Sequence, residues 1–499
     1  MTITDQKEQA LTLLQTGRFE EARRLVQSCL ERLPRDAQLL GAHGFLLAQA
    51  GNLPAARDSL SASIAAEPDN PSTFNHLGNV YRALGDYEGA ARSYSEALRL
   101  KPQYPEALNN IGALFYRQGK LTQASGIFEK ALRLDSHSLD ILYNLANTYV
   151  KLDNPGMAQQ LYERLLELSE DHIGANHNLG ILLVSLGKLS EAESYLKKAL
   201  SRDTKALDAH YHLALVQGAQ GHTEEAIRLY AMVLAKVPEH ALAHHNVATL
   251  YLSLKEKGKA LHHFKKALAL NPQNATAQHF VLALEGEQPS AAPVSFVKDL
   301  FDFYAPNYDS HLKKGLDYQV PYELRALVSP YKPLGDNLWF GIDIGCGTGL
   351  CAPSFTDIVY RLVGIDISSQ MLAQAKKLDA YHRLHEGDIT AVLNHHYVGL
   401  ADIIIAGDVL GYIGALENVF KSVAQALKNN GYFVLSIELS ADTDWSLQPT
   451  GRYQHSREYV QRTAQMFGLQ PIDARHFSLR VQDGSPVPGM GLLLQKTSI

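Results

Sequence analysis

Small and large apolar residues recur along the first half of the chain with a period of 34 residues. The period runs without insertion from Ile3 to Asn274, in units that begin at residues 3, 37, 71, 105, 139, 173, 207 and 241. The eighth position of each unit is glycine or alanine. The twentieth is always alanine, namely Ala22, Ala56, Ala90, Ala124, Ala158, Ala192, Ala226 and Ala260. Small side chains at two fixed positions let antiparallel helices approach closely, so the pattern predicts stacked helical pairs.

The ends of the units carry helix-stop signals. Proline ends the second helix in most units, at Pro34, Pro68, Pro102, Pro238 and Pro272. Units 4 and 5 have Ser136 and Glu170 there, which leaves the geometry of their turns open. A ninth amphipathic helix, residues 274–286, is expected to cap the last exposed face. The small and proline-containing segment 286–295 then predicts a linker.

This combination of small, large, aromatic and proline positions resembles the tetratricopeptide repeat (TPR). The resemblance implies an all-α superhelical solenoid over residues 1–285, made of eight repeats and a capping helix. In that family the first helix of each repeat lines an inner wall. The implied partner is a protein or peptide held in the groove of the repeats.

Asparagine recurs at the sixth position of four units, at Asn110, Asn144, Asn178 and Asn246. This series resembles the asparagine ladder of O-linked N-acetylglucosamine transferases. An amide both donates and accepts, so it can pair with a peptide backbone whatever the peptide's side chains are. These amides are then expected to meet ligand or solvent, and not the core of a helix pair. The alternative is that asparagine is only a common consensus residue at this position.

The second half of the chain alternates between apolar strands and amphipathic helices. The apolar run 338–344 predicts a buried strand, and Gly345, Gly347 and Gly349 follow it. Later strands are expected at 361–368, at 384–389 and at 401–410, and a fifth at 432–438 follows a helix. The last two strands are spaced as a hairpin. This order predicts an α/β fold with a mostly parallel sheet.

The glycine spacing distinguishes between two nucleotide-binding loops. A dinucleotide fingerprint requires its third glycine at position 350, which is Leu350 here. The form Asp343-Ile-Gly-Cys-Gly-Thr-Gly instead resembles motif I of class I S-adenosylmethionine-dependent methyltransferases. The resemblance implies a Rossmann-like domain over residues 296–499, with a seven-stranded sheet whose last strand is antiparallel. It also implies S-adenosylmethionine as the cofactor.

The same resemblance implies which residues bind the cofactor. Asp343 suits the ammonium group, Gly345 and Gly347 make the turn, and Asp366 accepts the ribose hydroxyls. Adenine is expected near Met371 and Asp388. The full implied set is Asp343, Gly345, Gly347, Asp366, Ile367, Met371, Asp388, Ile389, Gly407, Tyr304 and Tyr308. The two tyrosines belong to an aromatic segment that closes over the cofactor in several small class I enzymes; the alternative is that they pack on the core.

The segment 448–456 is expected to border the acceptor pocket. Arg452 is a candidate for holding an anionic acceptor, and His455 is a candidate for a catalytic base or hydrogen-bond donor. The alternative is a turn followed by a helix cap at Ser456. The sequence after the fourth strand, Gly407-Asp408-Val409, lacks the Asn/Asp-Pro-Pro-Tyr motif of enzymes that methylate adenine or glutamine.

Composition and charge exclude several other classes of function. A net charge of −6 disfavours a nucleic-acid partner. No apolar run reaches the roughly 20 residues of a membrane span, and no signal peptide is expected, so the sequence predicts a cytoplasmic protein with no membrane partner. The three cysteines support neither a disulfide framework nor a metal site.

The whole chain resembles bacterial predicted TPR-containing methyltransferases. The leading hypothesis is a methyltransferase whose repeats recruit a protein or peptide. The alternative is a small-molecule carboxyl or hydroxyl O-methyltransferase, with repeats used for localisation or self-association. A scaffold with an inactive domain is disfavoured because the acids and glycines of the motifs are present. The sequence leaves the methyl acceptor and the oligomeric state open.

Overall fold

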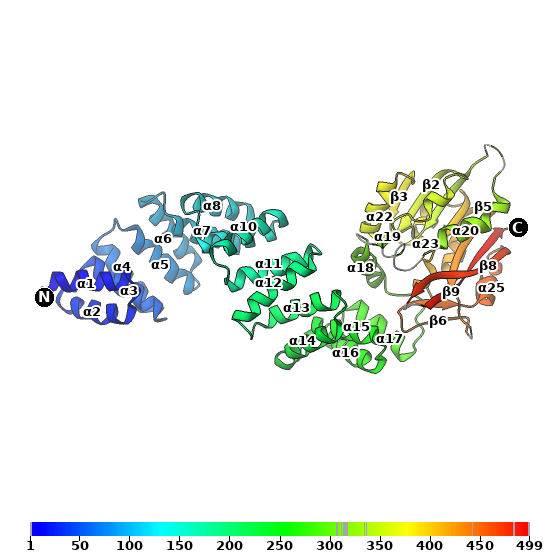
Figure 1. Cartoon of the computed structure of the whole chain (residues 1–499). Helices are drawn as coiled ribbons and strands as arrows, with labels where there is room; N and C mark the ends of the chain where they lie inside the picture. Colours follow the sequence, from blue (N-terminus) through cyan, green and yellow to red (C-terminus); the bar gives the residue numbers. More distant parts are fainter. Residues whose placement is uncertain are drawn as a thin grey trace. The chain divides into compact units, whose positions relative to one another are not determined.

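The computed structural model describes residues 2–305, 308–310, 312, 318–333, 335, 337–441, 443–482 and 485–497, without the side chains of residues 310 and 482. The chain divides into two compact units, Met1–Met232 and Val233–Ile499. The first unit consists of repeat helices, and the second contains the last helices of the array together with the α/β domain (Figure 1). No helix within the described ranges is both long and apolar enough to cross a membrane.

The repeats form consecutive antiparallel helix pairs, as the 34-residue period predicts. The first six repeats are α1 (Ile3–Gln15), α2 (Phe19–Arg32), α3 (Ala37–Gln49), α4 (Leu53–Ala66), α5 (Pro71–Ala83), α6 (Tyr87–Leu100), α7 (Pro105–Arg117), α8 (Leu121–Leu134), α9 (Leu139–Lys151), α10 (Pro155–Leu168), α11 (Ile173–Ser185) and α12 (Leu189–Arg202). The array continues with α13 (Leu207–Ala219), α14 (Thr223–Lys236), α15 (Ala241–Ser253), α16 (Lys257–Leu270) and the capping helix α17 (Ala275–Glu285).

Close helix contact explains the small residues of the period. The alanine at position twenty is fully buried in all eight units. A Cβ atom added to Gly78 would lie 2.4 Å from the ring of Tyr94, and one added to Gly112 would lie 2.6 Å from Phe128. The glycine therefore leaves the space that the large apolar residue of the second helix fills, and this interlocking supplies the core of each repeat.

The ends of the second helices do not depend on proline. Helix α6 ends two residues before Pro102. Helices α8 and α10 likewise end two residues before Ser136 and Glu170, the positions that lack proline. The turn geometry that the sequence left open is thus the same in these units.

Three of the predicted ladder asparagines bond to the preceding repeat. The Nδ2 of Asn110 donates to Oδ1 of Asn75 at 2.9 Å, and that of Asn144 donates to Oδ1 of Asn109 at 3.0 Å. The Nδ2 of Asn178 donates to the Tyr143 hydroxyl at 3.0 Å and to Asn147 at 2.8 Å. These amides are half-buried. They therefore join neighbouring repeats, which corrects the expectation that they meet only ligand or solvent. Asn246, in the second unit, is also engaged with a partner.

The α/β domain follows the array. Its helices are α18 (Val294–Tyr304), α19 (Tyr308–Ser310), α20 (Val320–Val328), α21 (Ala352–Phe355), α22 (Ser369–Ala375), α23 (Ile389–His396), α24 (Glu417–Ala426) and α25 (Arg457–Met466). Its strands are β1 (Trp339–Ile344), β2 (Val359–Asp366), β3 (Arg383–Glu386), β4 (Ala401–Ala406), β5 (Leu427–Glu438), β6 (Trp445–Leu447), β7 (Tyr453–His455), β8 (Leu469–Gln482) and β9 (Ser485–Lys496).

Seven of these strands form one sheet in the order β3-β2-β1-β4-β5-β9-β8. Strands β3, β2, β1, β4 and β5 are parallel, and β9 pairs antiparallel with β5 and with β8. The predicted Rossmann-like sheet with an antiparallel last strand is confirmed. Strand β5 begins at Leu427, five residues before the predicted start.

Alternating residues of the central strands face two helical layers. Ile342, Ile404 and Phe433 pack with α23, α24 and α25 on one face. Ile403 and Val434 pack with α20 and α21 on the other. Both faces are covered, so the parallel strands read as continuous apolar runs. The carboxyl ends of β1, β2 and β4 then carry the polar loops that follow them.

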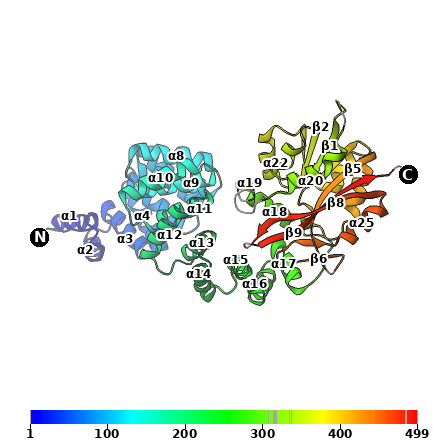
Figure 2. The ribbon, with the colours of Figure 1, turned by 45° about the vertical axis from the view of Figure 1, so that its right-hand side comes forward.

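The capping helix of the array packs directly on the α/β domain. His279 of α17 is fully buried, and its Nε2 donates to the backbone oxygen of Gly451 at 2.8 Å. Its ring stacks on Phe296 of α18 with centroids 4.6 Å apart. Ala283 of α17 shares an apolar cluster with Leu447 of β6, and α17 lies beside β6 in Figure 2. The last helix of the array is therefore also part of the core of the second unit.

The predicted linker is an ordered part of this unit. Ala291 makes a backbone bridge with Ile413, and the amide of Ala292 donates to the Tyr412 oxygen at 3.1 Å. The hydroxyl of Tyr453 donates to the Pro289 oxygen at 2.8 Å. These bonds fix the chain between the capping helix and α18 against the α/β domain.

We predict that the asparagine bonds stabilise the first unit. Asn144→Asp removes the donor that faces Asn109 and places two oxygens together, so it should lower the free energy of unfolding by about 1–3 kcal/mol. Asn109→Asp keeps the acceptor and is the matched control, with a loss below about 1 kcal/mol. Urea unfolding followed by circular dichroism measures both. Equal losses in the two variants would contradict the assigned bond.

We also predict that His279 anchors the capping helix. His279→Ala leaves the buried Gly451 oxygen without its donor and opens a cavity, so the free energy of unfolding should fall by about 2–4 kcal/mol. Gln278→Ala changes the exposed neighbour on the same helix and should have little effect. Thermal unfolding of the full chain tests this. An unchanged melting temperature in His279→Ala would show that the contact does not stabilise the unit.

Candidate functional site

The loop after β1 turns back sharply because its glycines adopt left-handed backbone conformations. Gly345 and Gly347 have φ values of 64° and 55°. A Cβ atom on Gly345 would lie 2.2 Å from the Val409 side chain, so no larger residue fits there. A Cβ atom on Gly347 would meet only open space. Both glycines line a cavity at the carboxyl ends of β1, β2 and β4.

Two predicted acids line the same cavity. Asp366 ends β2, and its carboxylate accepts from the backbone amides of Gly347 at 2.8 Å and Ser368 at 2.9 Å. Burial nevertheless raises the pKa of Asp366 above its ordinary value. Asp388 caps α23, accepting from the Ala391 amide at 3.0 Å. The predicted Ile367, Ile389 and Gly407 also line this cavity. The structure thus brings together most of the predicted cofactor residues.

Two other predicted residues point elsewhere. Asp343 is buried and accepts from the Tyr381 hydroxyl at 2.6 Å, and burial, with a smaller effect of Asp366, raises its pKa to about 7. Met371 is fully buried in α22. Neither side chain is among those that line the cavity. The predicted contacts of Asp343 with an ammonium group and of Met371 with adenine have no counterpart in this geometry.

Helix α18 closes one side of the cavity with Val294, Val297 and Phe301. An ion pair and a hydrogen bond hold the helix there. The Nζ of Lys298 lies 2.6 Å from Glu386, and Asp302 accepts from the Ser368 hydroxyl at 2.5 Å.

Three lining residues, Ala291, Ala292 and Val294, come from the segment predicted as a linker. A fragment that begins at residue 296 would therefore lack part of the cavity wall. The cavity therefore extends beyond the domain bounds 296–499 that the resemblance implied.

The two predicted tyrosines have different positions. Tyr308 lines the cavity, and burial, with the charge of Asp408, raises its pKa above the ordinary value. Tyr304 is 41% exposed and lies outside the set that lines the cavity. Only Tyr308 is placed to close over a bound molecule.

Arg452 belongs to a network of four charges, in which Glu438 and Arg480 are buried and Arg452 and Asp408 are partly buried. Its Nη2 lies 2.5 Å from Oδ1 of Asp408, and its Nε lies 3.4 Å from Glu438. Arg480 lies 2.9 Å from Glu438 and 3.8 Å from Asp408. Burial would raise the pKa of Glu438, but Arg452 and Arg480 lower it overall. Two cations and two anions balance, so the charge of Arg452 is already paired. This corrects its predicted role in holding an anionic acceptor.

His455 is a structural residue in this geometry. It is fully buried, and its Nε2 donates to the backbone oxygens of Ile413 at 2.9 Å and Gly414 at 3.1 Å. Burial lowers its pKa to about 4. It is not among the residues lining the cavity, which corrects its predicted role as a base. The hydroxyl of Ser456 accepts from the Tyr459 amide at 3.2 Å, so the alternative of a turn and helix cap is confirmed.

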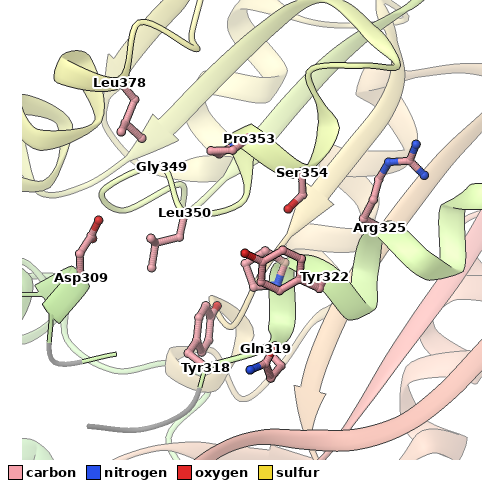
Figure 3. Close-up of a pocket in the computed structure, with 11 residues that line it drawn as sticks. Asp309, Tyr318, Gln319, Tyr322, Arg325, Gly349, Leu350, Pro353, Ser354 and Leu378 are labelled. Atoms are coloured by element: carbon pink, nitrogen blue, oxygen red, sulfur yellow. The ribbon is translucent and has the colours of Figure 1, made fainter. Parts of the chain in front are cut away.

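A second cavity of about 580 Å³ lies on the other side of the glycine loop, between Gly349, Leu350 and helix α20 (Figure 3). Tyr318, Tyr322 and Leu350 turn into it, and Arg325 at its edge is paired with Asp357 at 2.6 Å. A Cβ atom on Gly407 would lie 3.8 Å from the Tyr318 hydroxyl. Tyr318 therefore lies near Gly407 of the first cavity, while it lines the second. The second cavity lacks the two acids, so the candidate site is the first.

Phe301 and Tyr412 also line the cavity and are absent from the set predicted from the sequence. Phe301 follows Val294 and Val297 at helical spacing, and this shared face is a signal that points to it. Tyr412 had no such signal, because it lies in a short helical turn after β4. Within the described ranges, no group of three or more histidine, cysteine or acidic residues is arranged to hold a metal ion.

Comparisons with known proteins match both halves of the chain. A family model described as a methyltransferase domain matches residues 342–435. Models described as TPR repeat or tetratricopeptide repeat match residues 7–71, 78–119, 103–171, 137–205, 183–250 and 241–274. No curated protein matches the chain.

Several solved structures are similar to the repeats. YrrB, described as a TPR protein with an unusual peptide-binding site, is 25% identical, with a TM-score of 0.35, over 37% of this chain and 96% of that one. PilF of Pseudomonas aeruginosa is 17% identical, with a TM-score of 0.39, over 40% and 92%. The Cut9–Hcn1 assembly is 20% identical, with a TM-score of 0.43, over 55% and 54%.

The repeat matches fall on the helical pairs. The methyltransferase match runs from within β1 to within β5 and includes the loops after β1, β2, β3 and β4 that line the cavity. The chain is therefore a tetratricopeptide-repeat array fused to a methyltransferase domain.

Proposed function

We propose that this protein is an S-adenosylmethionine-dependent methyltransferase whose repeats recruit a protein or peptide. The observation that carries the proposal is the meeting of a left-handed glycine turn with two carboxylates, Asp366 and Asp388, in one cavity.

The residues present fit this nucleoside. The open space at Gly347 gives the backbone room beside a ligand, and Asp366 is held rigidly by two backbone amides. Each of its oxygens keeps a lone pair free for one ribose hydroxyl. Asp388 can accept from an adenine amino group, and Ile367 and Ile389 supply apolar contacts for the ring. When bound, the group supplies a methyl carbon activated by a positively charged sulfur.

The chain's own residues then align the acceptor and exclude water. Helix α18 covers the cavity with Val297 and Phe301, and Tyr308 and Tyr412 extend the aromatic wall. Removing water from such a site strengthens every polar contact inside it and fixes the reacting atoms in line.

The repeats support the proposed recruitment of a polypeptide. Eight antiparallel pairs provide the repeated inner wall that TPR arrays use for protein contacts, and the Oδ1 atoms of Asn110, Asn144 and Asn178 remain acceptors while their amide nitrogens bond the preceding repeat. We retain these residues and Asn246 as proposed peptide contacts. The alternative is a small-molecule carboxyl or hydroxyl methyltransferase, in which the repeats serve localisation or self-association.

We predict that Asp366→Asn weakens S-adenosylmethionine binding by about ten- to a hundredfold, because it removes a charge-assisted acceptor. Asp357→Asn makes the same chemical change outside the cavity and should bind as the wild type does. Calorimetry on the full chain measures both affinities. Undiminished binding in Asp366→Asn, or tighter binding of NAD than of S-adenosylmethionine, would overturn the assignment.

We predict that His455 contributes stability that depends on pH. Its folded pKa of about 4 lies below the ordinary value of about 6.5, so its contribution is complete above pH 6.5 and is lost as the pH falls toward 4. Between pH 7 and pH 5 the wild type should lose about 2 kcal/mol more than His455→Gln. Urea unfolding at the two pH values provides the measurement. Equal losses, with turnover abolished in a folded His455→Gln, would restore the catalytic interpretation.

A further inference from the structure

One wall of the cavity combines three aromatic rings with a carboxylate. Phe301 meets Tyr308 and Tyr412 edge to face, with ring centroids 6.0 Å and 5.2 Å apart. All three rings and Asp408 line the cavity. Arg452 lies over the Tyr412 ring at 4.9 Å and bonds Asp408, so this carboxylate sits beside the aromatic wall.

The carboxylate keeps an oxygen for a ligand. Arg452 and Arg480 both approach Oδ1 of Asp408. Neither arginine contact uses its Oδ2. The backbone amide of Asp408 donates to the Ser436 hydroxyl at 2.8 Å, which fixes the left-handed conformation of the residue, with φ at 60°. Asp408 therefore offers one oriented acceptor at the end of β4.

The charges of the cavity favour a cation over an anion. The charged side chains of the described lining are Asp366, Asp388 and Asp408, and no lysine, arginine or histidine is among them. The nearby arginines are balanced by Asp408 and Glu438. The described lining therefore offers a carboxylate acceptor no cationic side chain, whereas aromatic faces and a carboxylate together attract an ammonium group.

We infer that the methyl acceptor is an amine, held by the aromatic wall and by Oδ2 of Asp408. This inference rests on the proposed function, and it narrows the acceptor to one class. It disfavours the carboxyl acceptors that the small-molecule alternative allowed. Asp408 accepts a hydrogen bond from the amine nitrogen and orients its lone pair, while Phe301, Tyr308 and Tyr412 surround its carbon chain.

The transfer balances without a further reactant. An amine that arrives protonated first loses one proton to water. Its nitrogen lone pair then forms the new bond to the methyl carbon, and the electrons of the broken carbon–sulfur bond remain on sulfur. The methylated nitrogen carries the positive charge and releases a proton to solvent.

The test uses the full chain in two steps. Calorimetry first measures the binding of S-adenosylmethionine and of its demethylated product, S-adenosylhomocysteine. Butylammonium chloride and sodium butyrate, which have similar size and opposite charge, are then titrated into the protein saturated with that product. Butylammonium should bind at least about tenfold more tightly than butyrate. Asp408→Asn should remove this preference and change the affinity for S-adenosylmethionine by less than about threefold.

A second variant guards against misfolding, because Asp408→Asn also removes an ion pair. Phe301→Leu leaves the four-charge network in place and should weaken butylammonium binding while the affinity for butyrate stays the same. Equal binding of the two probes to the wild type would overturn the inference. So would an Asp408→Asn variant that loses S-adenosylmethionine and butylammonium in parallel, because the carboxylate would then serve the cofactor. Failure to bind S-adenosylmethionine at all would instead overturn the proposed function.

Discussion

The hydrogen bond from the Gly347 amide to Asp366 holds the candidate site together. It joins the loop after β1 to the end of β2, and it requires the left-handed backbone that glycine permits. The same carboxylate bonds Ser368, whose hydroxyl in turn donates to Asp302 of the covering helix α18. The Asp366 side chain therefore connects the loop after β1, the end of β2 and helix α18, which all line the cavity. Burial disfavours the charged form of this carboxylate, so its hydrogen bonds to backbone amides are needed to keep it in place.

Several polar side chains are buried inside the α/β domain. Asp343, Glu438, Arg480 and His455 are buried in it, and Arg452 is partly buried. The two arginines offset the desolvation of Glu438, whereas burial still shifts the pKa values of Asp343 and His455. The four-charge network joins strands that are distant in sequence, from β4 to β8. It therefore holds Asp408 in place at the cavity wall.

The sequence predicts those features that depend on local or repeated patterns. The 34-residue period gave the helix pairs because each repeat contacts only its neighbours. The apolar runs predicted most strands of the sheet, and the acids at the ends of β2 and β3 predicted two residues that line the cavity. The sequence could not show that Arg452 is paired, since its partners lie 44 and 14 residues earlier in the chain. It could not show that Ala291 lines the cavity, because a short polar segment reads as a linker until its backbone bonds are known.

The packing of α17 on the methyltransferase domain limits how this protein can evolve. Whole 34-residue units can be duplicated or deleted upstream without disturbing any contact of the α/β core, because solenoid repeats touch only their neighbours. The final unit lacks that freedom. His279 and Ala283 are buried against Gly451 and Leu447, so the last helix must change together with the hairpin beneath it. Proteins of this architecture should thus differ in the number of repeats at the amino-terminal end. They should share the capping helix, because it is packed as part of the methyltransferase domain.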